Sequence, residues 1–96
     1  MYYRFFAYDL ARTGKAKETA KKIIEACGGT SNVSKAGSGL FKVCVHLNDL
    51  ERYNLEYLKS LDVRQINETK DGIEIECGSS AFIVANRINH LIKVTN

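Results

Sequence analysis

The stretch Leu40-Phe41-Lys42-Val43-Cys44-Val45-His46-Leu47 alternates apolar and polar side chains from Phe41 onward. The apolar positions, which share one face of an extended chain, are Phe41, Val43, Val45 and Leu47. The opposite face carries Lys42, Cys44 and His46. A period of two is typical of a strand that packs one face and leaves the other accessible. The stretch therefore predicts a half-buried strand over residues 40–47, with Phe41 turned inward.

A pair of strands is expected further along the chain. Residues 63–69 and 72–77 flank the Asp71-Gly72 pair. This pair is a strong short-range signal for a hairpin turn, because glycine tolerates positive φ. In the second of these strands the inward side chains are expected to be Ile73, Ile75 and Cys77, and the outward ones Glu74 and Glu76.

Apolar residues at helical spacing predict a first amphipathic helix from Lys15 to Cys27. Gly28 and Gly29 are expected to end it, since glycine adopts the left-handed conformation that closes a helix without a Cβ clash. Cys27 belongs to the apolar stripe of this helix. We therefore expect Cys27 to be a core residue and not a reactive thiol.

Two more helices are predicted by the same criterion. A short one, with Asn48 or Asp49 placed to cap its first turn, carries the apolar residues Leu50, Tyr53, Tyr57, Leu58 and Leu61. The last one follows a capping Ser79 or Ser80, and its buried stripe comprises Ala81, Val84, Ala85, Ile88, Leu91 and Ile92. Together these elements predict an α+β two-layer open-faced sandwich, in which three helices cover one face of an antiparallel sheet of about four strands.

Residues 1–10 alternate around aromatic side chains and predict an extra N-terminal strand. Its two faces are formed by Tyr3, Phe5 and Ala7, and by Tyr2, Arg4, Phe6 and Tyr8. Because both faces are largely aromatic, the strand is expected either to be buried on both sides or to present one side to a partner. Pairing of residues 1–10 between two copies of the chain would make a homodimer.

Five short sequence landmarks lie between Ile23 and Gly78. They are Ile23-Ile24-Glu25-Ala26-Cys27-Gly28-Gly29, Asn32-Val33, Lys42-Val43-Cys44-Val45-His46-Leu47-Asn48-Asp49, Leu58-Lys59-Ser60-Leu61 and Gly72-Ile73-Glu74-Ile75-Glu76-Cys77-Gly78. In these landmarks and in their ungapped spacing the chain resembles the cytoplasmic B (EIIB) domain of glucose-type sugar permeases of the bacterial phosphotransferase system (PTS). The resemblance implies one EIIB-like domain over residues 1–96, with a family-like core at 15–93 and an extension at 1–14.

The resemblance also implies a function in sugar transport. In that family the domain takes a phosphoryl group from an EIIA phosphohistidine protein onto a cysteine and passes it to sugar in a membrane EIIC permease. Counting from Asn32, the cysteine position falls at Gly39, which has no nucleophile. Of two basic residues that follow in the family, one is retained as Lys42 and the other is replaced by Cys44. We therefore expect a docking or regulatory module without phosphocysteine activity, whose contact surface includes Ser38, Gly39, Leu40, Phe41 and Lys42.

Residues 34–39, Ser34-Lys35-Ala36-Gly37-Ser38-Gly39, are interpreted as a loop. Its glycines and serines are suited to an anion-binding concavity made of backbone N–H groups. The residues assigned to this phosphate or partner loop are Gly37, Ser38, Gly39, Leu40 and Lys42. An ordinary flexible turn is the alternative interpretation.

Cys44 is the one candidate for a substitute nucleophile. Strand alternation places it on the same face as Lys42 and His46, and positively charged neighbours favour the reactive thiolate. An active phosphocarrier that uses Cys44 is therefore an alternative function. A structural oligomerisation module that pairs through residues 1–10 is another.

The composition of the chain argues against several classes of protein. A chain of 96 residues with 45% hydrophobic side chains is long enough for one core and too short for two. The net charge of +3 is scattered, which argues against nucleic-acid binding. Three cysteines without CxxC spacing indicate neither a disulfide framework nor a metal site, and no cofactor is expected. The expected location is the cytoplasm, or the inner face of the membrane through a partner or a fused permease.

Overall fold

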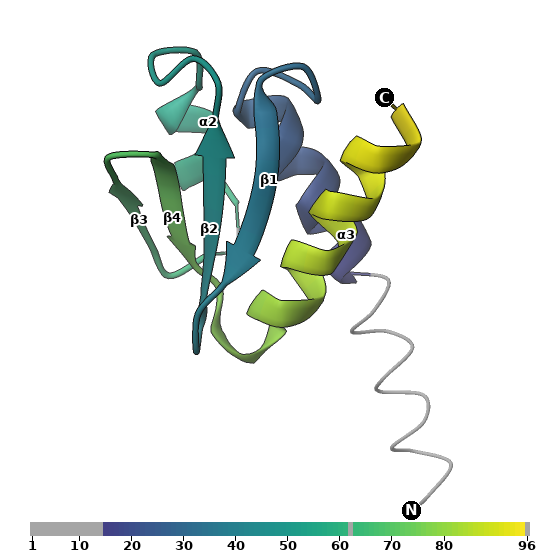
Figure 1. The fold of residues 1–96 in the computed structure, drawn as a ribbon. Coiled ribbons are helices and arrows are strands. Elements are labelled where there is room, and N and C mark those ends of the chain that lie inside the picture. The colour runs from purple at the N-terminus through teal and green to yellow at the C-terminus, as the bar shows by residue number, and fades with distance from the viewer. Residues whose placement is uncertain (1–14, 62, 96) are drawn as a thin grey trace, which may run out of the picture.

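Four strands form one antiparallel sheet in the order β1-β2-β4-β3 (Figure 1). They are β1 (Val33–Ser38), β2 (Lys42–Leu47), β3 (Gln65–Glu68) and β4 (Gly72–Glu76). The structure is a computed structural model that describes residues 15–61 and 63–95. Two hairpins, β1–β2 and β3–β4, are joined through the central pair β2–β4. The predicted four-stranded antiparallel sheet is confirmed, whereas the strand expected over residues 1–10 lies outside the described residues.

Three helices pack against one face of this sheet (Figure 1). They are the first helix (residues 15–26), α2 (Leu55–Lys59) and α3 (Ala81–Thr95), and a 3-10 turn, η1 (Gly78–Ser80), leads into α3. Their apolar stripes meet the inward side chains of the strands in one core. The buried apolar residues include Ala20, Ile23, Cys27, Leu58, Val84 and Ile88 from the helical layer and Val33, Val43, Val45, Ile73 and Ile75 from the sheet. The two-layer α+β architecture and the core position of Cys27 are confirmed.

The end of the first helix shows why two glycines follow it. The N–H of Gly29 donates to the carbonyl of Ile24, and that of Gly28 donates to the carbonyl of Glu25. This is the Schellman arrangement, which requires left-handed backbone after the helix. Gly28 has φ +96°, and a Cβ there would lie 2.9 Å from the carbonyl oxygen of Arg52. Gly28 thus both ends the helix and admits the loop that enters α2.

The second helix is shorter than predicted, and the predicted cap is wrong. Asn54, rather than Asn48 or Asp49, caps α2, because its side chain accepts a 3.0 Å hydrogen bond from the N–H of Tyr57. The side chain of Asp49 instead accepts from the N–H of Glu51 in a turn before the helix. Leu50 therefore lies outside α2 and is 47% exposed.

The loop predicted over residues 34–39 is also wrong for residues 34–38, which belong to strand β1. Strand β2 correspondingly begins at Lys42 and not at Leu40. The two serines expected to cap the last helix lie in η1, which precedes α3. Only residues 39–41 remain as the turn between β1 and β2, so the candidate site is a tight hairpin tip.

Candidate functional site

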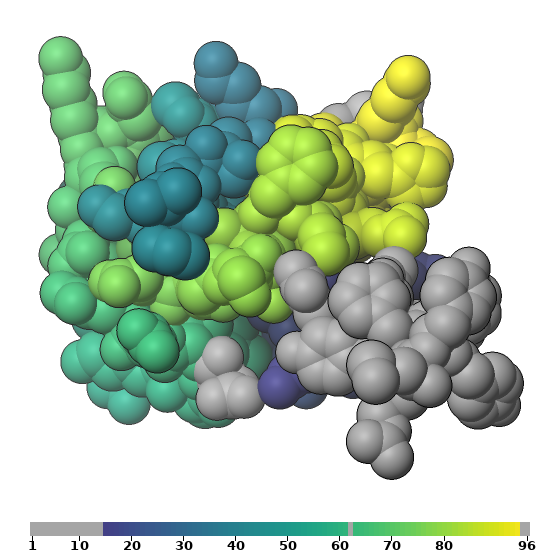
Figure 2. Space-filling view, turned by 90° about the horizontal axis from the view of Figure 1, so that it is seen from below, coloured from purple at the N-terminus to yellow at the C-terminus, as the bar shows by residue number. Residues whose placement is uncertain are grey.

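The hairpin tip comprises Gly39, Leu40 and Phe41. The turn is closed by the N–H of Gly39, which donates to the carbonyl of Lys42 at 2.8 Å. The carbonyl of Phe41 accepts hydrogen bonds from Cys77 at 3.1 Å and Gly78 at 3.2 Å. These bonds anchor the tip beside the start of α3, at the end of the molecule that Figure 2 shows.

Two large apolar side chains project from this anchored tip. Leu40 is 84% exposed and Phe41 is 50% exposed. The prediction that Phe41 turns inward is wrong, because Phe41 precedes β2 and the alternation of that strand does not extend to it. Exposed apolar side chains held on a fixed backbone are typical of contact surfaces. The predicted contact residues Ser38 to Lys42 are all exposed.

Gly39 itself is not required by the backbone at its position. It is not among the glycines with positive φ, and the nearest atom to a Cβ built on it is the Cβ of Lys42 at 3.9 Å. That separation is an ordinary van der Waals contact. A side chain, including a cysteine, therefore fits at the tip without displacing its neighbours.

The anion-binding concavity expected here is not supported by the position of its residues. Gly37 and Ser38 are strand residues, paired with Cys44 and Val43 of β2. In a strand, successive N–H groups point in opposite directions, so they do not converge on one anion as they do in a concave loop. Of the residues assigned to the phosphate or partner loop, only Gly39 and Leu40 lie in the turn.

Cys44 lies on the open face of the sheet with Lys42 and His46, as the alternation predicted. Its cross-strand neighbours are Gly37 on β1 and Glu74 on β4. The ammonium group of Lys42 lies 3.3 Å from a carboxylate oxygen of Glu74, so the positive charge expected beside the thiol is already paired. A carboxylate faces the half-buried Cys44, whereas nucleophilic cysteines have electropositive surroundings.

His46 does not complete a catalytic pair with Cys44. Its cross-strand neighbours are Lys35 on β1 and Gly72 on β4. No hydrogen bond joins the side chains of His46 and Cys44 within the described part of the chain. The structure brings the three predicted residues to one face but does not arrange them as a nucleophile and its base.

Burial disfavours the thiolate form of the other two cysteines. Cys27 is fully buried in the core, and this burial raises its pKa to about 12. Burial also raises the pKa of the half-buried Cys77. Because the thiolate is the nucleophile, both effects make these cysteines poor acceptors of a phosphoryl group at neutral pH.

We predict a clear order of thiol reactivity in the folded protein. With an aromatic disulfide reagent at pH 8, Cys44 should react first, Cys77 more slowly, and Cys27 only after unfolding in denaturant. Single cysteine-to-serine variants at residues 44 and 77 assign the phases, which are followed by absorbance. Fast labelling of Cys27 without denaturant would contradict its place in the core.

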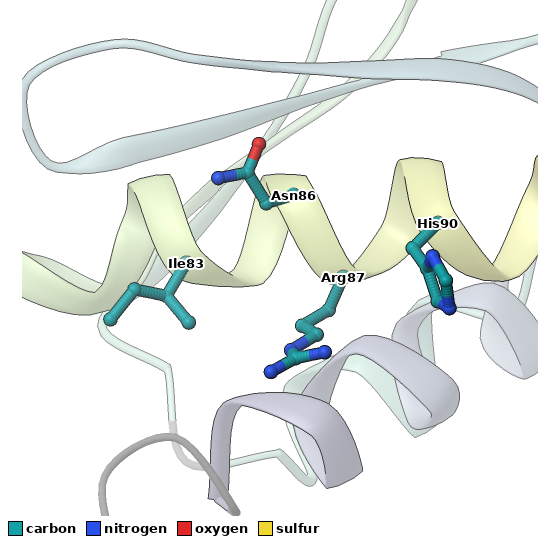
Figure 3. A pocket seen from close by; sticks show the side chains of 4 residues that line it. All are labelled: Ile83, Asn86, Arg87 and His90. Carbon is teal, nitrogen blue, oxygen red and sulfur yellow. The ribbon is translucent and has the colours of Figure 1, made fainter. Parts of the chain in front are cut away.

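A second feature, which the sequence patterns did not indicate, lies on α3. A depression of about 320 Å³ is lined by Ile83, Asn86, Arg87 and His90 (Figure 3). These positions are spaced along one stretch of the helix. The sequence feature that could have indicated this depression is the pair Arg87 and His90, which lie one helical turn apart.

Two comparisons with known proteins found no match. No protein-family model matches the chain, and no curated protein sequence matches it. Within residues 15–61 and 63–95, no helix has the length and apolar content needed to cross a bilayer. The same residues contain no group of three or more His, Cys, Asp and Glu side chains arranged to hold a metal ion.

Proposed function

We propose that this chain is an EIIB-like domain of the phosphoenolpyruvate-dependent sugar phosphotransferase system that has lost phosphocysteine chemistry and acts as a docking or regulatory module. The proposal is supported by the landmarks between Ile23 and Gly78 and is compatible with the two-layer α+β fold. Its proposed partners are an EIIA-like phosphohistidine protein and a membrane EIIC sugar permease. The proposed location is therefore the cytoplasmic side of the membrane.

One observation carries the proposal. The position of the family's phosphocysteine corresponds to Gly39, at a hairpin tip flanked by the exposed Leu40 and Phe41. The tip retains an exposed, anchored shape but has no nucleophile. Binding to a partner requires only the contact surface, whereas transfer of a phosphoryl group also requires a thiol. A contact surface without a thiol therefore suits a protein that binds or regulates its partner.

The test is phosphorylation of the purified chain by an EIIA-containing phosphorelay and phosphoenolpyruvate, read by intact mass. The native chain should gain no phosphate, whereas Gly39→Cys should gain one phosphate-sized increment, because this substitution places a thiol at the tip beside Lys42 without strain. The matched control is Gly37→Cys, a position on β1 where no atom lies within 4 Å of a built Cβ, so that a side chain fits there too. It should gain none.

Two results would count against the proposal. A gain by the native chain that is lost in Cys44→Ala would make the protein an active phosphocarrier using Cys44. Failure of Gly39→Cys to gain phosphate, in a relay that phosphorylates an authentic EIIB domain, would remove support for EIIA as the partner.

A further inference from the structure

The depression on α3 has a polar and an apolar part. Figure 3 shows Ile83, Arg87 and His90 projecting from one side of the helix toward the first helix, while Asn86 projects from the other side. At a rise of about 1.5 Å per residue, Arg87 lies about 6 Å along the axis from Ile83, and His90 lies about 4.5 Å further. A single surface therefore presents an aliphatic side chain, a guanidinium and an imidazole in that order.

Arg87 is the unusual member of this group. Its residue is partly buried, yet within the described ranges neither Arg87 nor His90 has a hydrogen-bond or ion-pair partner. The guanidinium of Arg87 therefore has no counter-charge among the described residues and is available to an incoming anion. Its planar fork of N–H donors matches the oxygens of carboxylates and phosphates.

We propose that this depression is a binding site for a small organic anion. Arg87 binds the oxyanion group, His90 contributes a donor one turn further along α3, and Ile83 contacts an apolar part of the ligand. The volume of about 320 Å³ is at the lower end of the range of small-molecule pockets. This inference is independent of the proposed function, because it uses neither the hairpin tip nor the phosphotransferase partners.

The apolar part of the ligand follows from the position of Ile83. Inorganic phosphate satisfies Arg87 and His90 but leaves the aliphatic end of the depression in contact with water. A ligand with a ring or short chain attached to the oxyanion covers Ile83 as well, and burial of apolar surface adds affinity. We therefore expect phenyl phosphate to bind several-fold more tightly than inorganic phosphate.

The test is a titration of the full chain followed by NMR at constant ionic strength. Phenyl phosphate should shift the backbone signals of residues 83–90 and the Arg87 Nε–H signal in a saturable way. Arg87→Gln should weaken binding at least tenfold, and Ile83→Ala should remove the preference over inorganic phosphate. Benzoate binding that also depends on Arg87 would support a general oxyanion site, whereas its absence would assign the site to phosphate esters.

Arg64→Gln is the matched control, because it removes the same charge from an exposed arginine next to β3, at the other edge of the sheet from β1. It should leave the affinity unchanged. Equal loss of affinity in Arg64→Gln and Arg87→Gln would overturn the proposal, since binding would then depend on net charge alone. Shifts that do not saturate, or that lie away from α3, would also overturn it.

Discussion

Replacement of Gly72 with alanine is expected to lower the free energy of unfolding by about 3 kcal/mol, because a new methyl group would be forced against backbone. A Cβ at residue 72 would overlap the carbonyl oxygen of Val45 and would lie 3.1 Å from the nitrogen of Leu47. Gly72 begins β4 and pairs with His46, near the end of the neighbouring strand β2. Neither strand can rotate away as a flexible side chain would, so the central strand pair must separate.

Gly29→Ala is the matched control for this prediction. Gly29 has φ +89°, but no atom lies within 4 Å of a Cβ built there. Its replacement should cost only about 1 kcal/mol, for left-handed backbone at a residue with a side chain. Both variants are measured by urea denaturation with a common slope. Equal losses would show that the β2–β4 pair admits a methyl group and that close approach is not the reason for Gly72.

The parts of the fold that follow from sequence are those fixed by strong local patterns. Alternation in residues 42–47 identified β2 and the faces of its side chains. The reason is that one face of this central strand is buried along its length, whereas the other is accessible. Gly28 and Gly29 located the end of the first helix within a residue. The DG pair at residues 71 and 72 placed the second hairpin. In each case the conformation that the local sequence favours is the one that the tertiary structure requires.

Strand β1 was missed because its sequence satisfies the strand pattern poorly. Only Val33 and Ala36 of its six residues are buried, and its register shifts between Val33 and Lys35. The outer edge of β1 is partly paired by a residue far along the chain. Asn89 on α3 accepts from the N–H of Ala36 at 2.9 Å and donates to its carbonyl at 2.7 Å. Pairing with β2 and with Asn89 makes this polar segment a strand, and neither is visible in the local sequence.

The surroundings of the candidate nucleophile depend on strand register, which the sequence does not specify. Alternation placed Lys42 and Cys44 on one face, but the residue opposite Cys44 is decided by how β2 pairs with β4. That pairing brings Glu74 to both Cys44 and Lys42. Glu74, which the sequence pattern predicted only to face outward, is therefore the residue that places a negative charge beside Cys44 and pairs with Lys42. Sequence predicted which three residues share this face of β2 but not which residue of β4 lies opposite them.

Asn32→Ala is expected to destabilise the protein by about 3 kcal/mol, because it removes the side-chain partner of one buried and three partly buried backbone groups. Asn32 is 1% exposed. Its amide nitrogen donates to the carbonyls of Cys27 at 2.8 Å, Asp49 at 3.2 Å and Arg52 at 2.9 Å. Its side-chain oxygen accepts from the N–H of Asp49 at 2.7 Å. One side chain thus joins the end of the first helix, the start of β1 and the loop before α2.

Two comparisons separate this role from a general effect of removing an asparagine. Asn48→Ala removes one exposed hydrogen bond, from the Asn48 amide to the carbonyl of Ser31, and should cost less than about 1 kcal/mol. Asn32→Asp keeps the shape and the acceptor but cannot donate to the three carbonyls, so it should destabilise at least as much as Asn32→Ala. The midpoint temperature of thermal unfolding should fall by roughly 4–8 °C for each kcal/mol of lost stability in a domain of this size. If Asn32→Asp were as stable as the native chain, the donor bonds would not be the reason for Asn32. If Asn32→Ala and Asn32→Asp both lower the stability as expected, Asn32 serves the fold and not phosphoryl transfer. Its side-chain amide is then accounted for by the hydrogen bonds that join three segments of backbone.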